Sequence, residues 1–352
     1  MPDGPTPDAV PDADAPQHRR RPRYAGKNPR RFEEKYKEHD PGRHSATVAK
    51  VLASGKTVAG THRPIMVAEI LAALAPRPGA VAVDATLGYG GHAQEILARI
   101  QPSGRLLGLD ADPVELPKTE ARLRALGFGP DVFTAHAGNF AGLPQVLAAA
   151  DLAGADLILA DLGVSSMQID DPARGFSVKL AGPLDMRMNP RRGRAASAWL
   201  ETVSPEALAR LLVDYADEPH AATLAPLLAG KIFATTNRLA DAIRAAVPRL
   251  DQDDRDQTVR RVFQALRIAV NDEFSALEAF LRVLPACLNP GGRVAVLTFH
   301  SGEDRRVKQA FAAGRREGVY AAIADEVIRA APAERRANPR STSAKLRWAR
   351  KA

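Results

Sequence analysis

The chain has 352 residues, a hydrophobic fraction of 45%, and 49 Lys and Arg residues against 41 Asp and Glu, which gives a formal net charge of +8. This length and composition exclude a wholly disordered chain and indicate one large domain or two ordinary ones. The single cysteine, Cys287, excludes an intramolecular disulfide and a zinc site built from several thiolates. Neither an apolar run of about 18 residues nor a secretory signal is visible, so we expect a cytoplasmic protein without a membrane span.

The positive charge is concentrated at the two ends of the chain. Residues 19–37 and 335–352 each carry a net charge of +7, residues 1–18 carry −4, and the long stretch 38–334 carries −2. Basic ends indicate an anionic partner, with nucleic acid first and an acidic membrane surface second. Solvated tails explain the same composition equally well. Residues 1–59 contain eight prolines and few aliphatic side chains, and they are predicted to be mostly disordered.

From residue 60 onward, short apolar runs alternate with helical patterns. Strands are predicted over residues 80–85, 105–110, 132–135, 156–161 and 293–298, and helices over 67–74, 92–100 and 114–126. This alternation predicts an α/β fold with a parallel sheet and right-handed crossovers.

The last predicted strand begins some 130 residues after the fourth one ends, which is far more than a crossover needs. Helices are predicted between them over residues 196–200, 205–215, 220–234, 239–247 and, as one long segment, 258–284. We therefore expect an N-terminal extension (1–59), a core of two pieces (60–172 and 260–352), and an inserted all-helical domain (173–259).

A glycine-rich turn follows the first predicted strand in the sequence Asp84-Ala-Thr-Leu-Gly88-Tyr-Gly90-Gly91-His92. Glycines let the backbone approach a ligand closely, and the following helix offers free N–H groups. Asp110 ends the second strand and is placed to accept hydrogen bonds from ribose hydroxyls. These features predict an adenosine-bearing cofactor. The spacing Gly-x-Gly-Gly, with an acid four residues earlier, is similar to the first motif of S-adenosylmethionine-dependent methyltransferases. An NAD-dependent dehydrogenase is the alternative.

Asp161 ends the fourth predicted strand, where methyltransferases that modify exocyclic amines place an acceptor for the target N–H. Here the chain resembles the bacterial 16S ribosomal RNA (cytosine-N4) methyltransferase family, which modifies a decoding-centre cytosine. The motifs that carry the resemblance span residues 61–347. They are His62-x-Pro64, Asp84-Ala-Thr-x-Gly88-x-Gly90-Gly91-His92, Asp110-x-Asp112-Pro113, Asp161-Leu-Gly-Val-Ser-Ser, Arg174-Gly-Phe-Ser, Gly182-Pro-Leu-Asp185-Met-Arg187-Met, Arg261-Val-Phe-Gln-Ala-Leu-Arg267-Ile-x-Val-Asn271, Asn289-Pro-Gly-Gly, Phe299-His300-Ser301-x-Glu303-Asp304-Arg305 and Asn338-Pro339-Arg340-Ser341.

The resemblance implies a Rossmann-like methyltransferase sheet with an inserted helical domain, S-adenosylmethionine as cofactor, and 16S ribosomal RNA within the small subunit as substrate. It also implies no metal, in agreement with the absence of a ligand cluster in the His, Asp and Glu spacing. The oligomeric state stays open. Matching the motifs residue by residue implies these cofactor contacts: Gly90, Gly91, His92, Asp110, Phe140, Asp161 and Gln168.

Three residues are the candidates for catalysis: Asp161, His300 and Ser301. Asp161 either accepts the N–H of the target amine or serves the methionine end of the cofactor. His300 and Ser301 follow the fifth strand and either contact the target base or shape a turn. Phe140 either covers the adenine or packs in the core, and Asp185 and Arg187 either meet RNA or pair with each other.

Other activities and contacts stay open beside this one. Methylation at C5 of cytosine needs a cysteine nucleophile, and Cys287 precedes the fifth strand, where it reads as a buried structural residue. Methylation of another RNA amine, and a ribosome-assembly factor with a vestigial pocket, are further alternatives. RNA contacts are expected from the N-terminal basic cluster and from the C-terminal residues Arg340, Lys345, Arg347 and Arg350. Trp348 either stacks on a base or packs in the core.

Overall fold

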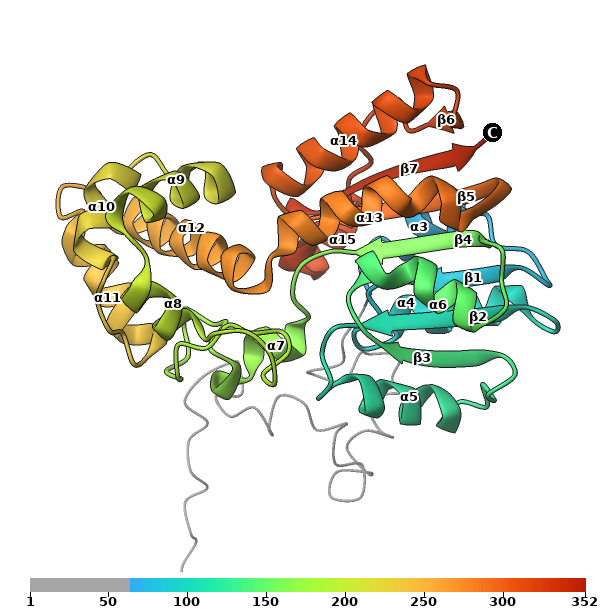
Figure 1. The fold of residues 1–352 in the computed structure, drawn as a ribbon, viewed down its shortest axis with the longest axis horizontal. Helices are drawn as coiled ribbons and strands as arrows, with labels where there is room; N and C mark the ends of the chain where they lie inside the picture. Colours follow the sequence, from blue (N-terminus) through green and yellow to red (C-terminus); the bar gives the residue numbers. More distant parts are fainter. Residues whose placement is uncertain (1–63) are drawn as a thin grey trace, which may run out of the picture. The chain divides into compact units, whose positions relative to one another are not determined.

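The computed structural model describes residues 64–352, and this part of the chain forms a seven-stranded sheet with the order β3-β2-β1-β4-β5-β7-β6 (Figure 1). Strands β1 to β5 are parallel, and β7 is antiparallel to both β5 and β6. The strands are β1 (Val81–Asp84), β2 (Arg105–Asp110), β3 (Phe133–Ala137), β4 (Ala155–Asp161), β5 (Leu288–Thr298), β6 (Tyr320–Ile323) and β7 (Lys345–Lys351). The predicted α/β fold is confirmed. The predicted disorder of residues 1–59 lies outside the described residues.

Alternate residues of the strands supply two separate hydrophobic cores, one on each face of the sheet. In β4, Leu159 belongs to the first core and Ile158 to the second. Helices α3 (Val67–Leu74), α4 (Gly91–Ile100) and α5 (Leu116–Ala125) cover the first core; α6 (Leu143–Ala149), α13 (Glu273–Cys287) and α14 (Ser301–Arg316) cover the second. Burial on both faces explains why the strands read as unbroken apolar runs.

The chain between β4 and β5 is helical and has a third core of its own. After the short α7 (Ser166–Asp170), it forms α8 (Ala196–Thr202), α9 (Pro205–Ala216), α10 (Ala221–Leu228), α11 (Thr236–Ala246) and α12 (Gln252–Asn271). Figure 1 shows α8 to α12 gathered beyond the carboxyl edge of the sheet. The described residues 64–352 nevertheless belong to one compact unit, and the expected boundary at residue 259 falls inside α12. The division into core and inserted domain therefore stays a prediction.

Two helical predictions are wrong in their extent. The segment 258–284 is not one helix, because Asp272 adopts a left-handed conformation (φ 51°) and separates α12 from α13. The apolar pattern continues across this break because α12 packs in the third core and α13 in the second. The helix expected over 220–234 ends at Leu228, two residues before Gly230, which has a φ of 70°. Aspartate and glycine are residue types that tolerate this conformation.

The basic C-terminal segment forms the internal strand β7, which the sequence analysis did not predict. Leu346 and Ala349 are fully buried, and the guanidinium of Arg347 donates to Asp304 at 2.6 Å. Lys345 lies 3.5 Å from the same carboxylate, and these cations hold the pKa of Asp304 below its usual range. Trp348 packs against the first core. Arg347 thus stabilises the sheet, and Trp348 takes the core-packing role among its two alternatives.

Two glycines explain why the motifs around Arg174 and Asp185 fold against each other. A Cβ on Gly182 would lie 1.8 Å from the carbonyl oxygen of Pro172, and a Cβ on Gly175 would lie 2.2 Å from that of Pro183. Gly175 also has a φ of 73°. The loops at 172–175 and 182–185 can therefore pack closely only without side chains at these two points.

Replacing Gly182 with alanine should lower the free energy of unfolding by roughly 2–4 kcal/mol, because the added methyl group must displace backbone. Gly129→Ala is the control, since a Cβ there meets nothing within 4 Å. Urea denaturation of both variants measures the difference. Equal stabilities would show that the two loops are not closely packed.

Candidate cofactor and substrate site

A cavity of about 390 Å³ opens at the carboxyl ends of β1, β2 and β4. The seven residues expected to contact a cofactor all line it: Gly90, Gly91, His92, Asp110, Phe140, Asp161 and Gln168. The cavity is within the size range of sites that hold a cofactor or drug-sized ligand. Two of the residues expected to act in catalysis, His300 and Ser301, are not among those that line it.

In residues 64–352 no group of His, Cys, Asp and Glu side chains could hold a metal ion, and no helix is long and apolar enough to cross a membrane.

The glycine turn brings the start of α4 to the cavity wall. Gly90 has a φ of 80°, and a Cβ there would lie 2.9 Å from Cγ2 of Thr119. A Cβ on Gly91 would lie 3.0 Å from the ring of Pro64. The hydroxyl of Thr119 donates to the carbonyl oxygen of Gly88 at 2.5 Å and fixes the turn. The first N–H groups of α4 therefore lie at the cavity, where they suit a ligand carboxylate.

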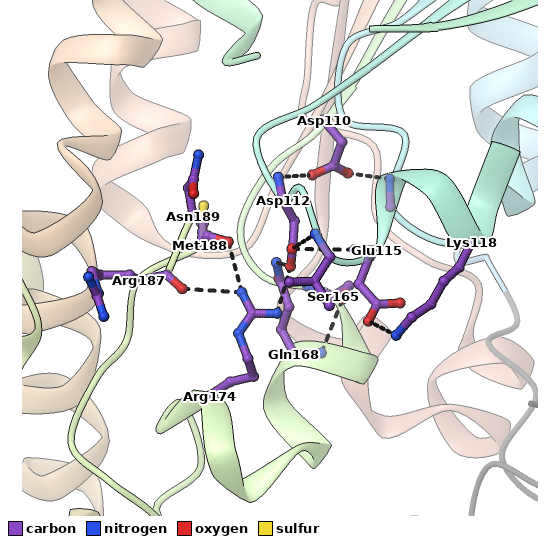
Figure 2. Close-up of polar contacts among 12 residues, drawn as sticks. Asp110, Asp112, Glu115, Lys118, Ser165, Gln168, Arg174, Arg187, Met188 and Asn189 are labelled. Atoms are coloured by element: carbon purple, nitrogen blue, oxygen red, sulfur yellow. Dashed lines mark hydrogen bonds and ion pairs between the residues drawn. The ribbon is translucent and has the colours of Figure 1, made fainter. Parts of the chain in front are cut away.

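Asp110 is held in place by two backbone N–H groups (Figure 2). Its Oδ2 accepts from the amide of Gly88 at 2.6 Å, and its Oδ1 accepts from the amide of Asp112 at 2.8 Å. Burial raises the pKa of Asp110 to about 6, so the carboxylate is mostly ionised at neutral pH. Each oxygen retains a second lone pair and can accept a hydrogen bond from a ligand hydroxyl.

A buried network connects the loop after β2 to the segment after α7. Oδ2 of Asp112 accepts from the side-chain amide of Gln168 at 2.8 Å and from Nη1 of Arg174 at 2.7 Å. Figure 2 shows Arg174 reaching across to the backbone of the 187–188 segment, where Nη2 donates to the carbonyl oxygens of Met188 (2.8 Å) and Arg187 (3.2 Å). Asp112 and Met188 both line the cavity, so this network holds the wall at Asp112 and the wall at Met188 in a fixed relative position.

Phe140 packs in the core, which is one of the two alternatives that its position in the sequence left open, and it also reaches the cavity. Its ring meets that of Phe280 edge to face, with the centroids 5.4 Å apart, and it packs against the second core. It also lines the cavity. A ring held in this way can cover a flat ligand without moving.

Asp161 presents an unpaired carboxylate oxygen. Its backbone N–H donates to the hydroxyl of Thr86 at 2.6 Å, which fixes the end of β4. Its Oδ1 is buried and has no hydrogen-bond partner among the described residues. Burial, reinforced by the carboxylate of Glu303, raises the pKa of Asp161 to about 7. A buried acceptor without a partner is costly, so this oxygen indicates a ligand that supplies a donor.

His92 lies beside this carboxylate in a single tautomer. Its Nε2 is 2.9 Å from the carbonyl oxygen of Ile65, which can only accept, so Nε2 carries the hydrogen. Burial lowers the pKa of His92, and the neutral ring then has a bare Nδ1, which lies 3.5 Å from Oδ2 of Asp161. The pair can share a proton but leaves Oδ1 of Asp161 unpaired.

The junction of α12, α13 and α14 supplies the opposite wall, which the sequence analysis did not include among the site residues. Nε and Nη2 of Arg267 each donate to Glu273 at 2.8 Å. Asn271 accepts from the amide of Met188 at 2.7 Å, and Glu303 accepts from the amide of Phe299 at 2.8 Å. All five residues line the cavity with Met188. Arg267, Asn271, Phe299 and Glu303 belong to two of the motifs that carry the family resemblance, but nothing in the sequence indicated their role.

His300 and Ser301 take supporting positions at the start of α14. Nδ1 of His300 accepts from the amide of Glu303 at 3.4 Å and its Nε2 lies 3.0 Å from the carboxylate of the same residue. The hydroxyl of Ser301 donates to Asp217 at 2.8 Å. Neither side chain lines the cavity, although the partner of His300, Glu303, does, so their expected catalytic contact stays a prediction. Asp185 and Arg187 pair with each other at 2.7 Å.

Comparison with known proteins identifies the family. Residues 59–352 match the family model described as the MraW methylase family. A protein of Alkaliphilus metalliredigens named ribosomal RNA small subunit methyltransferase H 2 is 48% identical, with 96% of this chain and 98% of its own covered. A protein of Lachnoclostridium phytofermentans named ribosomal RNA small subunit methyltransferase H 1 is 46% identical, with 96% and 94% covered. A protein of Myxococcus xanthus named ribosomal RNA small subunit methyltransferase H is 43% identical, with 81% and 96% covered.

The solved structures that align are more distant. A putative rRNA methylase from Clostridium thermocellum is 12% identical and aligns with a TM-score of 0.40 over 83% of this chain and 100% of its own. TrmN from Thermus thermophilus is 15% identical, with a TM-score of 0.38 over 82% and 48%. At these TM-scores the alignments carry no argument.

The relatives also extend the similarity into the N-terminal extension. The sequence resemblance begins near residue 61, and residues 60–352 are 293 of the 352 residues, or about 83% of the chain. The two relatives from Alkaliphilus metalliredigens and Lachnoclostridium phytofermentans cover 96% of it, so their alignment includes most of residues 1–59. The extension is therefore shared with some relatives and is not peculiar to this chain.

Replacing Asp161 with asparagine should change how stability depends on pH. The pKa of Asp161 is about 7 in the folded protein, against an ordinary 3.8. Between these pH values the folded protein holds a proton that the unfolded chain has lost, so the free energy of unfolding falls as pH rises toward the folded-state pKa. Relative to the wild type, Asp161→Asn should gain roughly 3 kcal/mol in free energy of unfolding between pH 5 and pH 8. Urea denaturation at both pH values measures it. The exposed Asp131→Asn is the control, and parallel behaviour of the two variants would contradict the buried, unpaired carboxylate.

Proposed function

This chain belongs to the MraW methylase family, and we propose that it transfers a methyl group from S-adenosylmethionine to the N4 amine of a decoding-centre cytosine in 16S ribosomal RNA of the small subunit. The names of the relatives and the ordered motifs support this substrate. The observation that carries it in the structure is the unpaired Oδ1 of Asp161, an acceptor buried in the same cavity as the adenosine-type features.

The residues of the cavity fit the cofactor. S-adenosylmethionine supplies an electrophilic methyl group on a sulfonium. Asp110 would accept from its ribose hydroxyls, the start of α4 at Gly91 would hold its carboxylate, and the ring of Phe140 would cover its adenine. Gln168 already engages both ends of its amide, so we assign it to shaping the wall beside Asp112.

Asp161 has two tasks in this proposal. The N4 amine is a poor nucleophile because its lone pair is delocalised into the ring, so a fixed acceptor is needed to orient it and to stabilise the positive charge that develops on nitrogen. Oδ1 of Asp161 accepts the N–H hydrogen bond. After transfer the nitrogen loses a proton, and a carboxylate with a pKa of about 7 is well matched to receive it at neutral pH. Nδ1 of His92 lies 3.5 Å from the other oxygen of Asp161 and can share that proton.

The structure disfavours methylation at C5 of cytosine. Cys287 is buried at the end of α13, does not line the cavity, and has its pKa raised to about 11 by burial. A thiol with such a pKa is not a nucleophile at neutral pH. An NAD-dependent dehydrogenase is disfavoured by the family match. A ribosome-assembly factor with a vestigial pocket is disfavoured because all seven residues expected to contact the cofactor line the cavity. Methylation of another RNA amine stays the alternative.

The remaining expectations belong to the same proposal. The protein would act in the cytoplasm on the small ribosomal subunit, with the core at 60–172 and 260–352 binding the cofactor and the helices of 173–259 forming the inserted domain. Arg340 lies at the cavity and pairs with Asp170 at 3.1 Å, so it is placed at the entrance rather than on a free tail.

The wild-type protein, incubated with S-adenosylmethionine and small subunits that lack the mark, should produce N4-methylcytidine on digestion of the RNA. Asp161→Ala should bind the subunits normally but lose transfer by two to three orders of magnitude, because the amine loses its acceptor. Asp131→Ala should behave as wild type. Label on another nucleoside, or none, would sink the proposed substrate.

Replacing Asp110 with alanine should weaken binding of S-adenosylhomocysteine by roughly 10- to 100-fold, since two ribose hydrogen bonds to a charged acceptor are lost. Binding to small subunits should change less than twofold. Calorimetry measures the first and filter binding the second, with Asp131→Ala as the matched control. Equal loss of both affinities would contradict the ribose assignment.

A further inference from the structure

One guanidinium nitrogen of Arg267 is left without a partner at the cavity. Nε and Nη2 of Arg267 are both held by the carboxylate of Glu273, and within residues 64–352 no hydrogen bond is made by Nη1. A Cβ on Gly163 would lie 3.9 Å from Nη1 and 3.8 Å from the ring of Phe299. Since Gly163 follows Asp161 by two residues, Nη1 lies beside the loop that carries the unpaired carboxylate.

Beside the end of β4 the cavity therefore offers an unpaired acceptor and an unpaired donor; a further unpaired acceptor, Oε2 of Glu115, lies at the start of α5, on the side of Asp110 and Asp112. The acceptor is Oδ1 of Asp161 and the donor is Nη1 of Arg267. Cytosine presents the complementary pair on neighbouring atoms, because its N4 amine donates and its ring N3 accepts. Uracil presents the opposite pair, an accepting O4 beside a donating N3–H. Enzymes that act on a flipped base commonly read this Watson–Crick edge.

We propose that Arg267 recognises the target base, with Nη1 donating to N3 of the cytosine while Asp161 accepts from N4, and that Glu273 is the residue that positions Arg267. This inference rests on the proposed function and extends it to the choice of base. Arginine suits the task, because its planar fork can bind Glu273 through two nitrogens and keep a third for the base, whereas lysine cannot.

The position of Arg267 favours the base over the carboxylate of the cofactor. Arg267 is on the last turns of α12, among the helices inserted between β4 and β5, whereas the start of α4 already offers N–H groups for a carboxylate. The aromatic rings of Phe274 and Phe299 line the cavity with Arg267. Flat aromatic surfaces suit an unstacked base.

The test combines a modified base with a modified side chain. Small subunits are reconstituted with 16S ribosomal RNA that carries cytidine or 3-deazacytidine, which lacks the N3 acceptor, at the target position. Wild type, Arg267→Met, Arg267→Lys and Glu273→Gln are compared by kcat/KM for the subunit. The control is Arg282→Met, an exposed arginine on α13 toward the opposite edge of the sheet.

We expect 3-deazacytidine to lower kcat/KM of the wild type by roughly 10- to 100-fold, the effect of one hydrogen bond to a charged donor. On cytidine subunits, kcat/KM of Arg267→Met and Arg267→Lys should fall by a similar factor relative to the wild type. On 3-deazacytidine subunits their kcat/KM should fall little further, because the variant and the modified base each remove the same hydrogen bond. Glu273→Gln should fall between them and the wild type. Arg282→Met should keep the full discrimination, and affinity for S-adenosylhomocysteine should stay within threefold in all variants.

Three results would overturn the inference. The first is a wild type with the same kcat/KM on cytidine and 3-deazacytidine subunits, and the second is a variant on 3-deazacytidine whose kcat/KM falls by the product of the two separate losses. The third is a loss of more than 10-fold in the affinity of Arg267→Met for S-adenosylhomocysteine. The last would assign Arg267 to the cofactor carboxylate. Even if a variant fails to fold, the wild-type kcat/KM on the two bases still tests whether the enzyme uses the N3 acceptor. A wild type that forms no N4-methylcytidine on unmodified subunits refutes the proposed function itself, which is a separate outcome.

Discussion

The end of β4 places a carboxylate where the sheet gives it no partner. Asp161 is fixed through its backbone by Thr86, approached by His92 on one side, and left with Oδ1 buried and unpaired. Such a group costs stability in the protein alone. The rest of the site surrounds this carboxylate: the glycine turn and Asp110, which we propose bind the cofactor, line one side of the cavity, and the junction of α12 and α13 lines the other. The unfavourable burial is reduced when the carboxyl binds a proton or when a ligand donor occupies the cavity.

The two sides of the site are joined by polar contacts that cross between elements far apart in the sequence. Arg174 binds Asp112 in the loop after β2 and the backbone at Met188, and Asn271 at the end of α12 binds Met188 as well. The inserted helices are therefore connected to Asp110 through a short chain of hydrogen bonds. A ligand that orders the loop at Asp110 will also order the segment at Met188, which gives a structural basis for coupling cofactor and substrate binding.

Much of this fold and half of this site could be predicted from the sequence. Buried parallel strands read as apolar runs, and the glycine turn with Asp110 and Asp161 predicts a cofactor site because these residues end neighbouring strands. The break at Asp272 was not predictable, because apolar spacing continues through it while the two helices face different cores. β7 was not predicted because its basic residues are unusual in a buried strand; two of them, Lys345 and Arg347, are paired with Asp304, more than 40 residues away. Arg267 and Glu273 lie within a helical pattern, and only the tertiary fold shows that they face Asp161 across a cavity.

The central claim is that Oδ1 of Asp161 receives the amine of the target base. A structure of the protein bound to the small ribosomal subunit with a non-reactive analogue of S-adenosylmethionine tests it most directly. We expect N4 of the target cytosine to lie within hydrogen-bond distance, about 2.7–3.2 Å, of Oδ1 of Asp161. A base whose amine faces Ser301 or His300 instead, with Asp161 bound to the cofactor, would contradict it.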